Sequence, residues 1–201
     1  AGTFMLGMEE NGWETTGVEL SEGVAALARN RHGLDVIAGT LEEASFPDAS
    51  FDAVSMWDVL EHLHDPSATL AEIYRILRPG GLLLIRVPNL DSWDAALFGQ
   101  EWAGLDAPRH LYVFTPQTLR RMLTQRDFEI VDESSNIGSY PTFALSVRFR
   151  MTAAGRSAKT QAMTSRLLYN PLTRLASGPL FYVSSVTRKG PLLVTTAQKP
   201  A

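Results

Sequence analysis

Cysteine is absent from this chain of 201 residues. Its absence excludes disulfide bonds, thiolate metal ligands and a cysteine nucleophile, and it fits a reducing compartment. Long apolar runs are lacking as well, because no stretch approaches the roughly 18 residues that a membrane-spanning helix needs, and no signal peptide opens the sequence. We therefore expect a soluble, cytoplasmic protein whose length suits one domain over residues 1–201.

Acidic residues are missing from the last third of the chain. Residues 134–201 hold nine of the 18 bases and no acid, whereas residues 1–133 hold all 22 acids and the other nine bases. This segregation predicts a basic surface that meets an anionic partner, either a membrane surface, to which the protein would be peripheral, or a phosphate. The alternative is that the opposite charges only hold the two parts together. Nucleic acid is not expected as a partner, because no recognition motif accompanies the bases.

Strand and helix patterns alternate along the sequence. We expect helices at 3–10, 21–33, 66–77 and 115–125, and strands at 13–20, 34–38, 51–56, 82–87, 128–132 and 192–197. Ser21 and Thr115 suit helix caps, and the apolar run 82–87, interrupted only by Arg86, suits an interior parallel strand buried on both faces. Repeating strand and helix units with short loops predict an α/β fold with a doubly wound, mainly parallel sheet.

Two stretches depart from this regular alternation. Residues 88–114 are rich in aromatic side chains and are expected to form a cap segment after the strand at 82–87. Residues 138–190 form a basic insertion between the last two strands, with helical pieces such as 161–169, and Pro171 argues against one long helix there. Connections this long are usually functional or disordered.

Glu19 ends the strand expected at 13–20. In an open α/β sheet, ligands bind beyond the carboxyl ends of the strands, where an acidic side chain can accept hydrogen bonds from both hydroxyls of a ribose. Taken alone, the same residue serves nicotinamide-dependent dehydrogenases equally well, and a strand-end glutamate is often only solvated.

Four segments carry a more specific pattern, in this order and spacing: GVELS at 17–21, FPDASFDAV at 46–54, WDVLEHL at 57–63 followed by DP at 65–66, and LRPGGLL at 77–83. Together they resemble the class I S-adenosylmethionine-dependent methyltransferases, in particular the ubiquinone-biosynthesis-like and type 11, 12 and 23-like members. The likeness covers about residues 1–133 and resumes near Gly190. It implies a Rossmann-like fold and S-adenosylmethionine as cofactor, with S-adenosylhomocysteine as product.

The resemblance also implies which residues contact the cofactor. Glu19 would bind the ribose and Leu20 would pack against the adenine, which Thr40 and Leu41 would edge. Many relatives have an aspartate in place of Thr40, so here that contact would come from a backbone group or from Glu42. Trp57 and Asp58 would lie beside the methionine part of the cofactor, and core packing is the alternative for Trp57.

The front of the sequence departs from the family. Relatives begin with a strand and a loop of the form acid-x-Gly-x-Gly-x-Gly, and only residues 1–4 match its tail, so Gly2 is the one glycine of that loop expected to contact the cofactor. The missing strand would be central, and its loss would leave two unpaired sheet edges. We expect the native protein to begin several tens of residues earlier.

Histidines supply the candidate catalytic residues, because imidazole is the natural base near neutral pH. His110 is the first choice, since it lies in a segment that resembles a cap facing the acceptor cleft of relatives. His62, beside Glu61, is the second, and a structural hydrogen bond is its alternative role. No metal site is expected, because the histidines are not grouped with carboxylates at helical spacing.

The predicted function is methyl transfer to a small-molecule acceptor, on an oxygen of a quinone-like, lipid or sugar substrate. A non-catalytic methyltransferase-like binding domain is one alternative, favoured by the missing loop and by Thr40. A nicotinamide-dependent oxidoreductase is the other, and the segments 57–62 and 79–81 speak against it.

Overall fold

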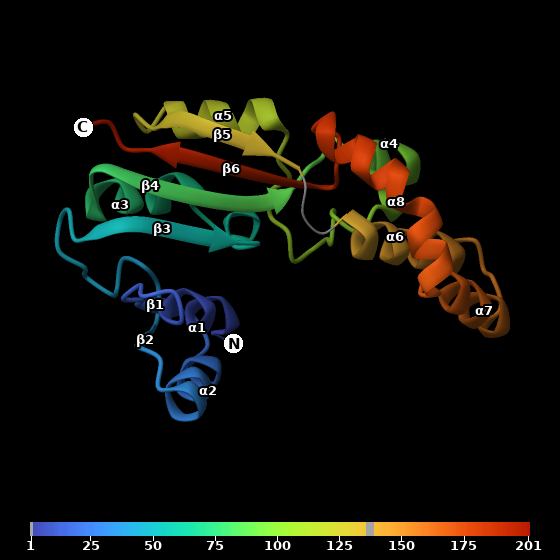
Figure 1. Ribbon diagram of the computed structural model, residues 1–201, viewed down its shortest axis with the longest axis horizontal. Coiled ribbons are helices and arrows are strands. Elements are labelled where there is room, and N and C mark those ends of the chain that lie inside the picture. The colour runs from blue at the N-terminus through green and yellow to red at the C-terminus, as the bar shows by residue number, and fades with distance from the viewer. Residues whose placement is uncertain (1, 136–138) are drawn as a thin grey trace. The chain divides into compact units, whose positions relative to one another are not determined.

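The computed structural model describes residues 2–135 and 139–201 (Figure 1). Ala1, in the expected loop tail, and residues 136–138, which include the first residue of the expected basic insertion, lie outside the described residues. The chain forms two compact units, Ala1–Ser50 and Phe51–Ala201. Each unit has its own sheet, and each is described by itself below.

The first unit contains α1 (Thr3–Glu9), β1 (Gly17–Glu19), α2 (Glu22–His32) and β2 (Val36–Ala38). The strands pair in parallel, with Glu19 opposite Ala38. As expected, α2 begins at Ser21, whose side chain accepts a hydrogen bond from the Val24 amide, and it ends at Gly33 with φ of 69°. A small apolar core of Ala25, Ala28, Leu34 and Val36 lies under α2, with Met5 of α1 packed against it.

The second unit contains a four-stranded sheet in the order β3 (Phe51–Trp57), β4 (Leu77–Pro88), β6 (Leu192–Gln198) and β5 (Glu129–Ser134). β3 and β4 are parallel, whereas β6 is antiparallel to both β4 and β5. β6 is therefore the one reversed strand in the described part of this sheet, and the predicted α/β fold is confirmed. Among the described residues, β1 pairs only with β2 and β3 only with β4, which agrees with the expectation of an unpaired edge on each strand.

β4 differs from its prediction in two ways. It begins at Leu77 rather than at Leu82, because Leu77 pairs with Phe51 of β3 and α3 (Pro66–Ile76) ends one residue earlier. It is interior, as expected, but not buried on both faces: Leu83, Ile85 and Val87 are buried and the alternate residues are only partly buried. The alternation follows the two-residue period of a strand whose neighbours cover one face more completely than the other.

Helices complete the second unit. η1 (Leu60–His62) follows β3. α5 (Pro116–Thr124) precedes β5 and has the expected cap at Thr115, whose own amide donates to the Thr118 hydroxyl. α4 (Trp93–Phe98) and η2 (Gly99–Glu101) occupy the cap segment. The insertion forms three helices, α6 (Ser139–Ala153), α7 (Ala158–Leu168) and α8 (Pro171–Val186), so the break predicted at Pro171 is confirmed.

The cap segment and the insertion pack on each other. Figure 1 shows α4 beside α6 and α8, at the end of the sheet where β4 finishes. Phe143 of α6 is the centre of an aromatic cluster, with ring centroids 5.5 Å from Trp93 and from Phe98 and 5.8 Å from Phe181 of α8. No helix in the described ranges is both long and apolar enough to pass through a bilayer.

Candidate functional site

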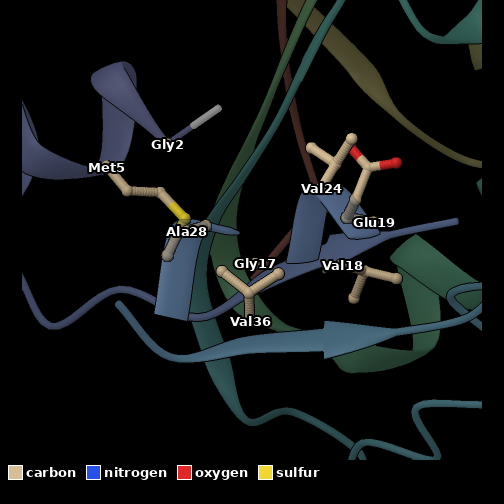
Figure 2. A pocket seen from close by; sticks show the side chains of 8 residues that line it. All are labelled: Gly2, Met5, Gly17, Val18, Glu19, Val24, Ala28 and Val36. Atoms are coloured by element: carbon tan, nitrogen blue, oxygen red, sulfur yellow. The ribbon is translucent and has the colours of Figure 1, made fainter. Parts of the chain in front are cut away.

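A shallow hollow opens at the carboxyl end of β1 in the first unit (Figure 2). Its floor is apolar, and Glu19 is its single charged lining residue: the lining residues are Gly2, Met5, Gly17, Val18, Glu19, Val24, Ala28 and Val36. Glu19 Oε1 accepts a hydrogen bond from the Ser21 amide at 2.9 Å, and no described residue donates to Oε2. Leu20, the next residue, is 72% exposed. The hollow thus combines an apolar floor with one carboxylate oxygen available at its rim.

Gly2 lies at the other side of this hollow, at the start of α1. Its φ is +80°, and a Cβ built on it would come within 2.3 Å of Leu34 Cδ1. A side chain there would be both strained and obstructed, so only glycine suits the position. Two of the predicted cofactor residues, Gly2 and Glu19, therefore line one hollow.

Thr40 and Leu41 follow β2 and are not among the residues that line the hollow. The Thr40 hydroxyl accepts the amide of Glu43 at 3.2 Å, and the Glu43 carboxylate accepts the Thr40 amide at 2.8 Å. This reciprocal pair closes a turn and occupies the Thr40 side chain locally. The assignment of Thr40 and Leu41 to the adenine edge stays a prediction.

Trp57 and Asp58 stand at the carboxyl end of β3, where Asp58 takes a left-handed φ of 56°. Arg86 of the neighbouring strand β4 binds both residues. Its guanidinium donates to the Asp58 carboxylate through Nε, at 3.1 Å, and through Nη2, and it lies over the Trp57 ring at 5.3 Å from the centroid. Sequence reasoning treated Arg86 only as an interruption of an apolar strand, although a lone charge opposite a strand-end acid was a usable signal.

Both predicted catalytic histidines are brought together after β3. His62 belongs to η1 and His110 to the loop before α5, and their ring centroids are 4.7 Å apart. Backbone hydrogen bonds join the two segments: the amides of Leu111 and Tyr112 donate to the Glu61 carbonyl at 2.8 and 3.2 Å.

The two imidazoles make the same kind of hydrogen bond. His62 Nδ1 donates to the Arg109 carbonyl and His110 Nδ1 to the Gly104 carbonyl, each at 2.9 Å. Since a carbonyl oxygen only accepts, both Nδ1 atoms carry the proton, and Nε2 of each neutral ring keeps its lone pair.

Glu61 completes the cluster and was considered in the sequence only as a neighbour of His62. Its side chain is 0% exposed, and its Oε1 lies 4.0 Å from His110 Nε2. Neither carboxylate oxygen accepts a hydrogen bond of normal geometry from a described residue. Burial raises the pKa of Glu61 to about 7 and the Asp58 carboxylate adds to the rise, whereas the backbone amide of Glu61, His62 and Arg86 oppose it. Burial of this degree could not be deduced from the WDVLEHL pattern.

The chain is similar in sequence to known methyltransferases. The sequence model of a family described as a methyltransferase domain matches residues 1–133. A malonyl-[acyl-carrier protein] O-methyltransferase of Serratia marcescens is 31% identical over 142 residues, which cover 70% of this chain and 54% of that protein. A demethylmenaquinone methyltransferase of Listeria welshimeri is 35% identical over 87 residues, 39% of this chain and 37% of that protein. The chain spans about half the length of the curated relatives it matches, or less.

Solved structures support the fold. The [4+2]-cyclase SpnF superposes with a TM-score of 0.63 at 22% identity, covering 100% of this chain and 71% of that chain. The 1,6-didemethyltoxoflavin-N1-methyltransferase of Burkholderia thailandensis, solved with S-adenosylhomocysteine, gives a TM-score of 0.57 at 21% identity, covering 100% and 67%. At these identities the likeness establishes the fold alone.

Proposed function

This chain belongs to the class I S-adenosylmethionine-dependent methyltransferases, and from that membership we propose that it methylates an oxygen of a small-molecule acceptor that is quinone-like, a lipid or a sugar. The observation that carries the choice of an oxygen acceptor is the pair of imidazoles after β3, each with a free Nε2 lone pair. A hydroxyl acceptor has to lose a proton during transfer, and a positioned imidazole is suited to take it.

The residues of the first unit fit the ribose and adenine part of the cofactor. Glu19 Oε2 is available to accept hydrogen bonds from ribose hydroxyls, and the apolar floor and exposed Leu20 suit an adenine ring. Gly2 lines the same hollow, where its left-handed backbone and the Leu34 side chain leave no room for a Cβ. Because the Thr40 hydroxyl is engaged with Glu43, we assign the adenine-edge contact to the backbone of Leu41.

In the second unit, we assign Trp57 and Asp58 to the methionine part of the cofactor. Arg86 fixes the Asp58 carboxylate and the Trp57 ring, so both are held before a ligand arrives. When bound, the cofactor supplies an electrophilic methyl group on a sulfonium centre.

Proton removal is assigned to the histidine pair. His110 is preferred because its side chain is only 11% exposed, and the buried Glu61 carboxylate 4.0 Å away would stabilise the imidazolium that forms. His62 is exposed and is the alternative base. Nε2 of His110 would take the O–H proton of the acceptor as its oxygen is methylated.

The basic insertion supports a membrane surface as the place where an apolar acceptor is met. Leu172 and Leu175 of α8 are 74% and 76% exposed, and Arg166 and Arg174 lie among such apolar residues with no acid nearby in the sequence. Exposed apolar side chains interspersed with bases are typical of interfacial helices on anionic lipids. A free phosphate would bind the same basic side chains and would not require the exposed apolar residues.

Calorimetric titration of S-adenosylhomocysteine tests the cofactor assignment. We expect Glu19→Ala to weaken binding by about 10- to 100-fold, the range expected for lost hydrogen bonds to a charged group. Glu14→Ala, an exposed acid before β1, is the matched control. Equal affinity in Glu19→Ala and the unaltered chain would contradict the assignment.

Transfer of a labelled methyl group to quinone-like, lipid and sugar hydroxyl acceptors tests the reaction. Turnover that disappears in His110→Ala but persists in His32→Ala supports the proposal. Cofactor binding without turnover of any acceptor would favour the non-catalytic alternative. The cyclase SpnF shows that this fold also serves other chemistry.

A further inference from the structure

Three side chains of the second unit bring metal-ligand atoms together. Glu61, His62 and His110 each offer one such atom, and the three atoms all lie within 4.8 Å of one another. We propose that this cluster binds one divalent transition-metal cation. The binding itself does not depend on the methyl transfer proposed above.

The two histidines make the kind of hydrogen bond that metal-binding histidines usually make. Each donates Nδ1–H to a backbone carbonyl, of Arg109 and of Gly104, which fixes the ring and directs the lone pair to Nε2. Metal-binding histidines almost always donate their second ring nitrogen to a carbonyl or carboxylate in this way, because the bond sets the tautomer and makes the ligand more basic. His62 and His110, which are 48 positions apart in the sequence, both make this hydrogen bond.

The Glu61 carboxylate provides a second, independent indication. Its side chain is fully buried, and neither oxygen accepts a hydrogen bond of normal geometry from a described residue. Burying a carboxylate without a partner is costly, and buried charges are paired or coordinate metals. Arg86, the nearby strand cation, already binds Asp58. A divalent cation between Glu61 and the imidazoles would remove the cost.

The donor set specifies the class of cation. Two imidazoles and one carboxylate suit Zn²⁺, Mn²⁺, Fe²⁺ or Co²⁺, whereas Ca²⁺ and Mg²⁺ prefer oxygen ligands alone. Metal bonds of about 2.0–2.2 Å to both atoms would require Glu61 Oε1 and His110 Nε2, 4.0 Å apart, to approach each other slightly for a tetrahedral site. Asp106 Oδ2 is 3.9 Å from the same nitrogen, but this carboxylate binds Arg109 at 2.6 Å.

Three protein ligands leave a coordination position for a further oxygen. Resting on the proposed function, we assign this position to the acceptor hydroxyl, whose pKa a bound cation would lower. With the cation bound, His62 and His110 would act as ligands instead of as the base assigned above, and the proton would leave the metal-bound hydroxyl for solvent. The sequence analysis expected no metal site, because His110 is far from Glu61 and His62 along the chain and only the fold brings the three together.

Cobalt titration tests the site on the whole chain, after chelation and without cofactor or acceptor. We expect one equivalent of Co²⁺ to produce the visible absorption bands of a nitrogen and oxygen site, and Zn²⁺ to displace it. Glu61→Gln keeps the shape of the side chain, and we expect it and His110→Ala each to weaken binding at least about tenfold. His64→Ala, an exposed histidine two residues from His62, is the matched control.

Two results would overturn the proposal. One is the absence of stoichiometric Co²⁺ or Zn²⁺ binding to a chain whose circular dichroism shows it to be folded. The other is binding that His64→Ala reduces as much as the cluster variants do. The role in catalysis is tested apart from the site: methyl transfer that chelation abolishes and Zn²⁺ or Mn²⁺ restores supports it, and transfer unaffected by chelation overturns it.

Discussion

Arg86 of β4 donates two hydrogen bonds to the carboxylate of Asp58, the residue that follows β3. The same guanidinium covers the Trp57 ring, and the Asp58 amide donates to the Arg86 carbonyl at 3.0 Å. One arginine thus joins the carboxyl ends of two adjacent strands through its side chain and its backbone. Since both side chains are only partly exposed, the pair is shielded from solvent more than a surface ion pair is.

A double-mutant cycle measures this link. We expect Arg86→Met and Asp58→Asn each to destabilise the second unit, with a coupling energy of about 1 kcal/mol, because the pair is bidentate and partly buried. Urea unfolding of the single and double variants provides the values. The exposed pair Arg78 and Asp52 is the control, and we expect less coupling there. Equal coupling in the two pairs would contradict the shielding.

Two glycines with the same left-handed backbone conformation allow the cost of backbone strain to be separated from the cost of a steric clash. Gly2 and Gly12 have φ of +80° and +84°, but a Cβ on Gly12 meets nothing within 4 Å. We expect Gly12→Ala to cost about 1–2 kcal/mol for the left-handed backbone alone. Gly2→Ala should cost more, because its Cβ would overlap Leu34. Amide hydrogen exchange in α2 and β2 reports on this unit, and equal protection in both variants would contradict the steric account.

Asp94 makes stability depend on pH. Burial raises the pKa of Asp94 above 3.8, although hydrogen bonds from Ser92 and Trp102 oppose the rise. The folded chain therefore holds this proton to higher pH than the unfolded chain does, and stability falls as the pH rises from 3.8 through the raised value.

We expect Asp94→Asn to make that decline less steep without abolishing it, because Glu61, whose pKa burial raises to about 7, lowers stability in the same direction. The introduced amide oxygen can still accept the bond that Trp102 Nε1 now donates at 2.9 Å. Melting temperatures from pH 4 to 7 provide the comparison. Asp132→Asn, an exposed acid of β5, should keep the slope of the unaltered chain. A parallel pH dependence of Asp94→Asn and the unaltered chain would show that another group causes the decline.

Binding to lipid vesicles tests the basic insertion. We expect sedimentation with vesicles of an anionic phospholipid, and reduced sedimentation when Leu172 and Leu175 are both replaced by serine. Val131→Ser, at an exposed apolar position on β5 outside the insertion, is the control. Retention of inorganic phosphate without vesicle binding would assign the bases to a phosphate site instead.

Local patterns predicted the elements of the fold well. The caps at Ser21 and Thr115 were identifiable because a helix start depends on residues within one turn of it. The boundary at Leu77 was missed because pairing with Phe51, a distant residue, overrides the helical pattern that includes Leu77. The end of a strand depends on the strand that it pairs with, and a local sequence pattern gives no information about that partner.

The candidate site could also be predicted only as far as local sequence patterns reach. Glu19 was singled out because it ends a strand pattern, His110 because its segment resembles a cap segment of relatives, and His62 because it lies in the segment after the next strand. Their roles stay predictions. The bond between Arg86 and Asp58 and the burial of Glu61 depend on tertiary contacts between distant segments. Contacts of that kind leave no periodic trace in a single sequence.

The Glu61 carbonyl, which accepts the amides of Leu111 and Tyr112, has a consequence for transplanting parts of this protein. A loop carrying His110 that was grafted from a relative would position its imidazole only if the graft also supplied those two amide donors in register. Segment 104–112 and the turn after β3 are therefore one unit of exchange. Chimeras that divide them should misplace the histidine even when the side chains of Glu61, His62 and His110 are all retained.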